Sequence, residues 1–244
     1  MKRILIVGGA NGIGLSIATE LANRNNTEKV YIIDRAPLAP IHAHPKFEAH
    51  IFDLESDDYS IFDRFHDIDT LMITAGFGHL QLFKDIEEKY ITSSFKVNAE
   101  APIRIIKHFY HKISSANDFR CGVMVSIAGF MSSPFFSVYA ATKAALKIFI
   151  ESVNVELEKS GVSNRILNVS PGSIKGTSFN KGETDLSLTQ NLATEIISNL
   201  QSKADLFIPQ YNEVFKDVLA RYHDDFRKEG SHSYDYKLNR INNA

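Results

Sequence analysis

The chain has 244 residues, a formal net charge of −2 and one cysteine. This length suits a single α/β domain with a substantial core. Because the charges balance and no local basic patch is present, we do not expect a nucleic-acid partner. Cys121 cannot form an internal disulfide, and no apolar run is long enough for a signal peptide or a membrane span. We therefore expect a cytoplasmic protein with no membrane association.

Short apolar runs alternate with longer segments of helical periodicity over the first part of the chain. The runs are apolar almost throughout, which favours strands buried on both faces of a parallel sheet. The predicted strands cover residues 3–7, 29–33, 47–52, 70–74, 123–126 and 165–169. The predicted helices cover residues 13–24, 85–95, 99–113 and 138–159. This alternation predicts a doubly wound parallel α/β sheet with right-handed crossovers, formed by one domain over residues 1–244.

The pattern changes after Pro171 and Gly172. A polar segment leads into leucine and isoleucine residues spaced at four between 188 and 200, which predicts one face of a helix. Residues 206–209 are typical of a last short strand. An amphipathic helix is expected over residues 214–226, followed by a polar tail over residues 230–244.

A glycine-rich turn links the first predicted strand directly to the first predicted helix. Its glycines let the backbone turn tightly and approach a pyrophosphate, while the N-terminus of the helix favours the negative charge of that group. Glycine turns without ligands are common, but the place of this one after the first strand favours a dinucleotide site. We expect cofactor contacts from Gly8, Asn11, Gly12, Ile13 and Gly14.

Asp34 ends the second predicted strand. There its carboxylate can accept hydrogen bonds from an adenosine ribose and repel a 2′-phosphate, which favours NAD(H). The adjacent Arg35 could instead pair with a 2′-phosphate. We therefore expect NAD(H) as the preferred cofactor and keep NADP(H) as the alternative.

Tyr139 and Lys143 lie four residues apart at the start of a long predicted helix, so their side chains share one face. A lysine ammonium beside a phenol favours the phenolate and lowers the pKa of the tyrosine. Tyr139 could then exchange a proton with an alcohol or a carbonyl. An exposed surface pair is the ordinary alternative, since this spacing is frequent in helices.

The surroundings of this pair resemble the short-chain dehydrogenase/reductase family, in its single-domain Rossmann-like form, from Arg3 to about Pro209. Ser126 precedes Tyr139 by thirteen residues, and Asn98 stands in a Val-Asn-Ala element. The resemblance implies that Tyr139 is the acid or base, that Lys143 tunes it and binds the nicotinamide ribose, and that Ser126 orients the substrate oxygen. It also implies that Asn98 bends its helix and holds a water in the proton path. All four residues are thus candidate catalytic residues, and the family role implies cofactor contacts from Asn98, Tyr139 and Lys143.

Other segments resemble the cofactor-binding elements of this family. Asp53 and Leu54 match the pair that holds the adenine ring, and a simple strand-end turn is the alternative. Ala75 and Gly76 match half of the family's Asn-Asn-Ala-Gly element, in which Thr74 here replaces the second asparagine.

The turn after the sixth predicted strand resembles the family segment that touches the nicotinamide. It contributes Pro171, Gly172 and Ile174, whereas Thr177 falls one residue late because Gly176 intervenes. The resemblance implies that the region of about 173–205 forms the substrate loop or lid.

The resemblance implies an oxidoreductase that transfers a hydride between a nicotinamide cofactor and a carbonyl or secondary alcohol. An NADP(H)-dependent ketone or 3-oxoacyl reductase is a near alternative, and a nucleotide-sensing protein without turnover is the alternative from a different class. Pairing through the helices at 99–113 and 138–159 would give a homodimer or homotetramer. The substrate would be a small molecule that the sequence does not identify.

Two further groups of side chains have simpler interpretations. His42, His44 and His50 cluster without matching acidic or cysteine ligands, so we expect a solvated loop and no metal site. Phe135 and Phe136 precede the catalytic tyrosine, where they either form a pocket wall or fill core space.

Overall fold

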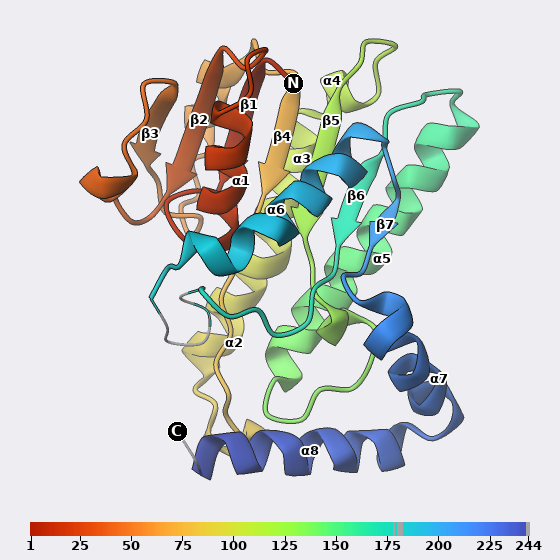
Figure 1. Ribbon diagram of the computed structural model, residues 1–244. Coiled ribbons are helices and arrows are strands. Elements are labelled where there is room, and N and C mark those ends of the chain that lie inside the picture. Colours follow the sequence, from red (N-terminus) through yellow and green to blue (C-terminus); the bar gives the residue numbers. More distant parts are fainter. Residues whose placement is uncertain (178, 180–182, 243–244) are drawn as a thin grey trace.

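Seven parallel strands form one sheet in the order β3-β2-β1-β4-β5-β6-β7 (Figure 1). The computed structural model describes residues 1–177, 179 and 183–242. The strands are β1 Arg3–Val7, β2 Lys29–Asp34, β3 Phe47–Ile51, β4 Thr70–Ile73, β5 Arg120–Met124, β6 Ile166–Val169 and β7 Leu206–Phe207. The predicted doubly wound, Rossmann-like sheet of a single α/β domain is confirmed.

Helices cover both faces of the sheet, and the last two helices lie beyond the carboxyl ends of its strands (Figure 1). They are α1 Gly12–Ala22, α2 Glu88–Phe95, α3 Ala101–His108, α4 Tyr110–Ile113, α5 Ser137–Lys159, α6 Leu186–Gln201, α7 Lys216–Asp224 and α8 Phe226–Asn242. Two π-helical turns, Lys96–Glu100 and Tyr211–Phe215, precede α3 and α7. Short 3-10 turns lie at Pro40–His42, Ser60–Phe65, Phe83–Asp85 and Ile127–Gly129. Within the described part of the chain, no helix is both long and apolar enough to cross a bilayer.

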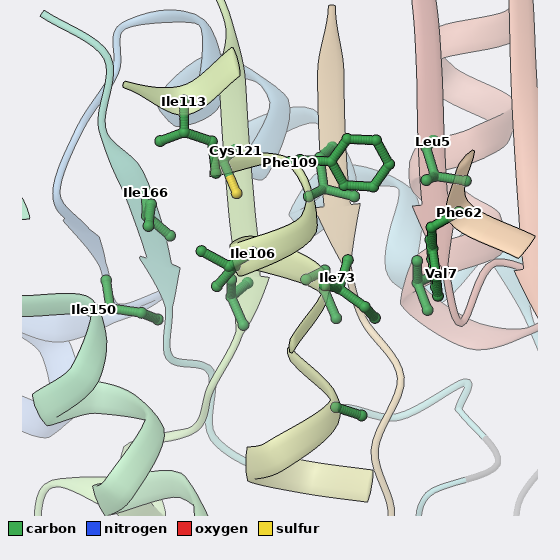
Figure 2. Close-up of a cluster of buried hydrophobic side chains, with 14 of the residues drawn as sticks. Leu5, Val7, Phe62, Ile73, Ile106, Phe109, Ile113, Cys121, Ile150 and Ile166 are labelled. Atoms are coloured by element: carbon green, nitrogen blue, oxygen red, sulfur yellow. The ribbon is translucent and has the colours of Figure 1, made fainter. Parts of the chain in front are cut away.

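Alternate side chains of the central strands enter two separate cores. Leu5 and Val7 of β1 face the side covered by α3 and α5, where they belong to one buried cluster that also contains Ile106 of α3 and Ile150 of α5 (Figure 2). Ile4 and Ile6 face the other side, which α1 and α6 cover. The two-residue period of a strand therefore explains why these apolar runs need helices on both faces. Cys121 is buried in the first cluster.

Several predicted boundaries differ from the structure for local reasons. β5 begins at Arg120, three residues early, because Cys121 and Gly122 pair with β6. β3 is the edge strand and is partly exposed, so burial on both faces is wrong for this strand. The helix expected over 99–113 is interrupted at Phe109 and is joined to α2 by the π-helical turn.

The C-terminal region departs most from the sequence-based expectation. The helix predicted over 214–226 ends at Asp224, and α8 occupies most of the stretch expected as a polar tail. Asp225 is extended, and its carboxylate accepts hydrogen bonds from the backbone N–H groups of Arg227 and Lys228. A side-chain cap at a helix start satisfies otherwise unpaired donors, so Asp225 ends one helix and begins the next.

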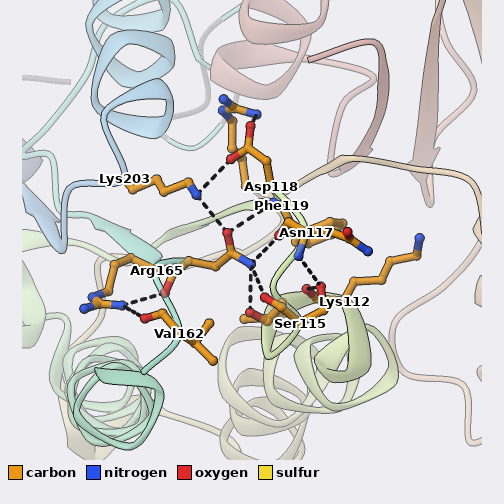
Figure 3. A network of polar contacts seen from close by, with 11 residues as sticks. Lys112, Ser115, Asn117, Asp118, Phe119, Val162, Arg165 and Lys203 are labelled. Carbon is orange, nitrogen blue, oxygen red and sulfur yellow. Dashed lines mark hydrogen bonds and ion pairs between the residues drawn. The ribbon is translucent and has the colours of Figure 1, made fainter. Parts of the chain in front are cut away.

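A polar network lies at the amino ends of β5 and β6. The side-chain amide of Asn164 donates to the backbone oxygens of Ser115 and Asn117, and its Oδ1 accepts from Lys203 (Figure 3). Asn164 is buried, so these bonds satisfy a polar group that would otherwise be costly. The candidate site lies at the opposite edge of the sheet, at the carboxyl ends of the strands.

Candidate active site

The carboxyl ends of five strands converge on one edge of the sheet. β1 leads into the glycine turn, β2 ends at Asp34, β4 leads to Ala75, β5 leads to Ser126 and β6 leads to Pro171. In open parallel sheets, ligands bind at this edge, where the strand order changes direction. The change occurs here between β1 and β4, next to the glycine turn.

The glycine turn has no space for side chains at two of its positions. Gly8 has a φ of +88°, and a Cβ at Gly14 would lie 2.1 Å from the carbonyl oxygen of Gly8. Thr74 donates its hydroxyl to the carbonyl oxygens of Val7, at 3.1 Å, and Gly8, at 2.8 Å. In the sequence, Thr74 stands out only as a departure from the Asn-Asn-Ala-Gly element. Its signal was its place at the end of β4, since Ile73 pairs with Val7.

Asp34 is fastened to the glycine turn by backbone hydrogen bonds. One carboxylate oxygen accepts from the N–H of Ala10 at 3.0 Å, and the other accepts from Ala36 at 3.1 Å. A carboxylate oxygen has two acceptor positions, so each retains the capacity for a second bond. Arg35 is exposed beside it.

A cavity of about 140 Å³ opens between these strand ends. Eight of the residues expected to contact a cofactor line it, namely Gly8, Asn11, Asp34, Arg35, Asp53, Leu54, Ala75 and Gly76. Phe77 and Val97 extend its wall. Asp53 accepts a hydrogen bond from the N–H of Glu55 through its Oδ1, which orders the turn after β3. Gly12, Ile13, Gly14 and the segment 171–177 lie outside this lining.

The segment after β6 nevertheless reaches the glycine turn. A Cβ at Gly12 would lie 3.5 Å from the Cβ of Thr177, and the Gly12 N–H donates to the hydroxyl of Thr184 at 3.1 Å. Thr177 itself donates to the carbonyl oxygen of Ile174. Thr184 was missed because it belongs to no motif. Part of the expected substrate loop, residues 178 and 180–182, lies outside the described residues.

Asn98 is held at the π-helical turn between α2 and α3. Its side-chain amide donates to the carbonyl oxygen of Phe77 at 2.8 Å, and its Oδ1 accepts from the Phe77 N–H at 2.9 Å. A π-helical turn inside a helix frequently marks a functional position. The geometry agrees with the expected local distortion of the helix at Asn98.

Asn98 and Lys143 meet beside Gly76, Lys143 lies near Tyr139, and Tyr139 hydrogen-bonds Ser126. A Cβ on Gly76 would lie 3.1 Å from Asn98 Oδ1 and 3.3 Å from Lys143 Nζ. The Lys143 ammonium donates to the carbonyl oxygen of Met124 at 2.9 Å and lies 5.7 Å from the centre of the Tyr139 ring. The structure thus brings all four predicted catalytic side chains together. Tyr139 and Lys143 are buried, so they do not form an exposed surface pair.

Burial controls the protonation of this pair. Burial raises the pKa of Tyr139 to about 12, and a hydrogen bond with Ser126 opposes this rise only in part. Burial also lowers the pKa of Lys143 to about 7. In the cofactor-free protein, desolvation therefore determines the direction of the Tyr139 pKa shift, which is opposite to the lowering expected from the neighbouring lysine.

Aromatic rings cover the phenol of Tyr139. The rings of Phe136 and Phe179 lie 5.5 and 5.2 Å from it. Gly78 lies against the rings of Phe179 and Tyr139, and a Cβ at this position would lie only 2.9 Å from both. Phe136 therefore forms a wall of the site, whereas Phe135 packs on Tyr234 of α8. Phe179 was not predicted, because its place in the loop carries no sequence pattern.

The three histidines do not form a metal site within the described ranges, where no group of three potential ligands lies together. His50 instead hydrogen-bonds Glu48, and His44 accepts from the N–H of Lys46.

Solved structures share this fold at low sequence identity. A short-chain dehydrogenase from Streptomyces avermitilis superposes with a TM-score of 0.76 and 21% identity, covering 97% of each chain. A short-chain dehydrogenase from Burkholderia cenocepacia, solved in complex with NADP, superposes with a TM-score of 0.73 and 19% identity, covering 91% of this chain and 98% of the other.

Curated relatives match the sequence over most of its length. Sorbitol-6-phosphate 2-dehydrogenase of Klebsiella pneumoniae is 29% identical over 79% of this chain and 77% of its own. Human 17-beta-hydroxysteroid dehydrogenase type 1 is 28% identical over 69% of this chain and 56% of its own. An uncharacterized oxidoreductase of Saccharomyces cerevisiae, TDA5, is 27% identical over 72% of this chain, and the match spans only 56% of that protein.

A family model supplies the remaining comparison. The model described as short chain dehydrogenase matches residues 2–186, which contain strands β1 to β6 and all four catalytic candidates. The chain belongs to the short-chain dehydrogenase/reductase family of oxidoreductases.

Proposed function

We propose that this protein transfers a hydride between a nicotinamide cofactor and the carbon of a carbonyl or secondary alcohol. The observation that carries the proposal is the burial of Ser126, Tyr139, Lys143 and Asn98 together beside a cavity at the carboxyl edge of the sheet. An oxidoreductase with an intact set of acid–base groups at this position has the parts that such a reaction needs.

The chain's own residues fit a dinucleotide. The backbone cradle at Gly8 and Gly14, which a Cβ would fill, allows close approach of a pyrophosphate to the N-terminus of α1. The residues assigned to the cofactor are Gly8, Asn11, Gly12, Ile13, Gly14, Asp34, Arg35, Asp53, Leu54, Ala75, Gly76, Asn98, Tyr139, Lys143, Pro171, Gly172, Ile174 and Thr177. When bound, the nicotinamide supplies the hydride chemistry.

Tyr139 and its neighbours supply the proton and hold the substrate oxygen. With a pKa raised by burial to about 12, Tyr139 stays protonated at neutral pH and can donate its Oη proton to a carbonyl oxygen. Ser126 donates a hydrogen bond to the same oxygen, and Lys143 adds positive charge beside the phenol when it is protonated. Asn98 holds the loop at Phe77 and, in the family role, orders a relay water.

The proposal is tested with a screen of ketones, sugars and polyols in both reaction directions, followed by Tyr139→Phe. We expect this variant to lose roughly 10²- to 10⁴-fold in kcat, because the proton donor is removed, while cofactor binding is unchanged. Tyr110→Phe is the matched control, since Tyr110 lies in α4 on the far side of the core cluster. Near-normal turnover by Tyr139→Phe would refute the assignment, and absence of turnover by the wild type would favour a nucleotide-sensing protein.

We propose NAD(H) as the preferred cofactor because Asp34 places a carboxylate beside the cavity. NADP(H) remains the alternative, favoured by the exposed Arg35 and by the NADP bound to the Burkholderia relative. Thermal shifts with NADH and NADPH distinguish the two, since the preferred cofactor stabilises the folded state more at equal concentration. Asp34→Ala should reduce any preference for NADH, and Asp63→Ala, at an exposed carboxylate, should not.

The substrate and the assembly are also proposals. The named activities of the relatives differ between a sugar-alcohol phosphate and a steroid, so they do not agree on one substrate. Pairing through α3 and α5 into a dimer or tetramer is supported by Ile148 and Val155 of α5, which are both 57% exposed. Sedimentation that shows only monomer at micromolar concentration would contradict this assembly.

A further inference from the structure

The last helix, α8, lies across the end of the molecule where the catalytic helix α5 begins (Figure 1). It contacts the loop between Ser126 and Tyr139. The rings of Tyr234 and Phe135 lie 4.8 Å apart, and a Cβ at Gly230 would lie 3.4 Å from Ser132 Oγ. Phe135 has a φ of +65°, which is a strained backbone conformation for an aromatic residue and is common at functional positions. This loop thus packs against α8 and has one residue in a conformation that local preference disfavours.

Lys237 extends from α8 toward the catalytic phenol. Its ammonium donates to Ser133 Oγ at 2.6 Å and to the carbonyl oxygen of Pro134 at 2.9 Å. It also lies 5.4 Å from the centre of the Phe136 ring, and that ring lies 5.5 Å from the ring of Tyr139. One aromatic side chain thus separates this cation from the proposed proton donor.

Among residues 1–177, 179 and 183–242, no carboxylate pairs with Lys237, and its partners there are neutral oxygens and an aromatic face. Glu229, the buried carboxylate of the same helix, is instead bound by Arg221 at 2.7 Å. Burial lowers the pKa of Lys237 to about 8, so the amine still carries its charge for the most part at neutral pH. A partly buried cation without a counter-ion attracts an anion more strongly than a solvated surface lysine does.

Two donors in this region have unused capacity. An ammonium has three N–H donors, and two are used by Ser133 and Pro134. Ser132 Oγ is buried and has no hydrogen-bond partner in the described part of the structure. Buried polar groups are normally satisfied, and an unsatisfied one suggests a missing partner such as a ligand or a water.

We propose that Lys237 is a specificity-determining residue that binds an anionic group of the substrate, a carboxylate or a phosphate, while the reacting carbon lies at Tyr139. This inference rests on the proposed hydride transfer and adds a substrate class to it. The substrate then carries its anionic group a few atoms from the reacting carbon, because only the Phe136 ring separates the two positions. Neutral ketones and alcohols lack the group that this cation binds.

The experiment compares matched anionic and neutral probes on the full chain saturated with its preferred cofactor. The pairs are 3-hydroxybutyrate against its methyl ester and glycerol 3-phosphate against glycerol, which separate the carboxylate from the phosphate source. Both kcat/KM and equilibrium binding by titration calorimetry are measured for the wild type, Lys237→Met, Lys237→Arg and Lys228→Met. Lys228 is the matched control, since it is exposed on the same helix.

We expect the wild type to prefer the anionic member of at least one pair. Lys237→Met should lose roughly ten- to a hundredfold in affinity and kcat/KM for that member, because a charge-assisted hydrogen bond is removed, with less than about a twofold change for its neutral counterpart. Lys237→Arg should retain most of the preference, and Lys228→Met should behave as the wild type.

Equal losses by Lys237→Met on anionic and neutral probes would overturn the inference and make Lys237 only a tether for the loop at 132–136. No anionic preference in binding or turnover would overturn it as well. Anion binding that depends on Lys237, without turnover of any probe by the wild type, would support the inference and count against the proposed reaction. The two failures are therefore distinguishable.

Discussion

The two ends of the candidate site are built in different ways. The cofactor side rests on β1, β2 and β4, whose central residues are almost fully buried, and on backbone positions where no side chain fits. The proposed substrate side includes α8, in which Glu229 is buried and the other side chains described through Asn239 are partly or fully exposed. The proposed cofactor side thus rests on buried strands, whereas the proposed substrate side includes a lightly packed helix.

This difference has a physical basis. A pyrophosphate is bound by backbone N–H groups, whose position depends on buried strands that tolerate little change. Side chains on partly exposed helices can vary at little cost in stability. We therefore expect substitutions on the cofactor side to affect cofactor binding strongly, and substitutions on the α8 side to affect substrate affinity moderately.

The largest effect should come from Gly14→Ala. The added Cβ would lie 2.1 Å from the carbonyl oxygen of Gly8, so the backbone cradle must move. We expect cofactor affinity to fall by more than about a hundredfold in fluorescence titration. Gly161→Ala is the control, because its φ of +73° strains the backbone but no atom lies within 4 Å of the new Cβ. It should cost about 1 kcal/mol of stability and leave cofactor affinity unchanged. Equal cofactor affinities of the two variants would contradict the close-approach argument.

A smaller effect should come from Tyr234→Ala, which removes the ring that packs on Phe135. The loop before Tyr139 should lose its support, so the KM of the substrate found in the screen should rise by about three- to tenfold, while cofactor affinity stays constant. Tyr236→Ala, at a position 62% exposed on the same helix, serves as the control. A loss of cofactor affinity in Tyr234→Ala would show that the two sides are not separable.

The smallest effect concerns stability and pH. Burial lowers the pKa of Lys143 from 10.5 to about 7, so between these pH values the unfolded chain binds a proton that the folded chain does not. The contribution of Lys143 to stability therefore rises with pH across this window and is least favourable at and below pH 7. Lys143→Met should stabilise the cofactor-free protein by about 1–2 kcal/mol at pH 7, and this gain should shrink toward pH 10.

Urea unfolding at pH 7 and pH 9.5 measures this change. Lys147→Met is the matched control, since Lys147 lies on the next turn of α5 and pairs with Glu151 at the surface. A gain for Lys143→Met that does not depend on pH would indicate that packing, and not the buried charge, is responsible.

The features that could be predicted from the sequence lie mainly on the cofactor side, and those that could not lie mainly toward the C-terminus. The parallel sheet, the glycine turn and the Tyr139–Lys143 pair could be predicted from local periodicity and spacing, and the grouping of Asn98 and Ser126 with that pair from the family resemblance. The interruption at Phe109 and the two-helix C-terminus could not. The C-terminal break follows from the cap at Asp225, and α8 is held at its place by contacts with a distant segment, such as Lys237 with Ser133.

The protonation of Tyr139 and Lys143 differs from what their spacing in the sequence predicts. The spacing of Tyr139 and Lys143 correctly places two chemical groups side by side, but it does not report how much water surrounds them. Burial by Phe136 and Phe179 raises the pKa of the phenol, while burial of the lysine lowers the pKa of its amine. Solvation is a property of the assembled neighbourhood, so its sign could not be obtained from two residues.

The sequence by itself determined the fold, the family and the identity of the residues proposed for hydride transfer. The fold follows from strand and helix periods, whereas the family and the proposed residues follow from the resemblance of several motifs to those of the short-chain dehydrogenase/reductase family. Only the tertiary structure decided that Thr74 stabilises the glycine turn, that Phe179 covers Tyr139, and that a cation from α8 lies beside the site. Each of these contacts joins residues far apart in the chain, and packing free energy rather than local preference brings them together.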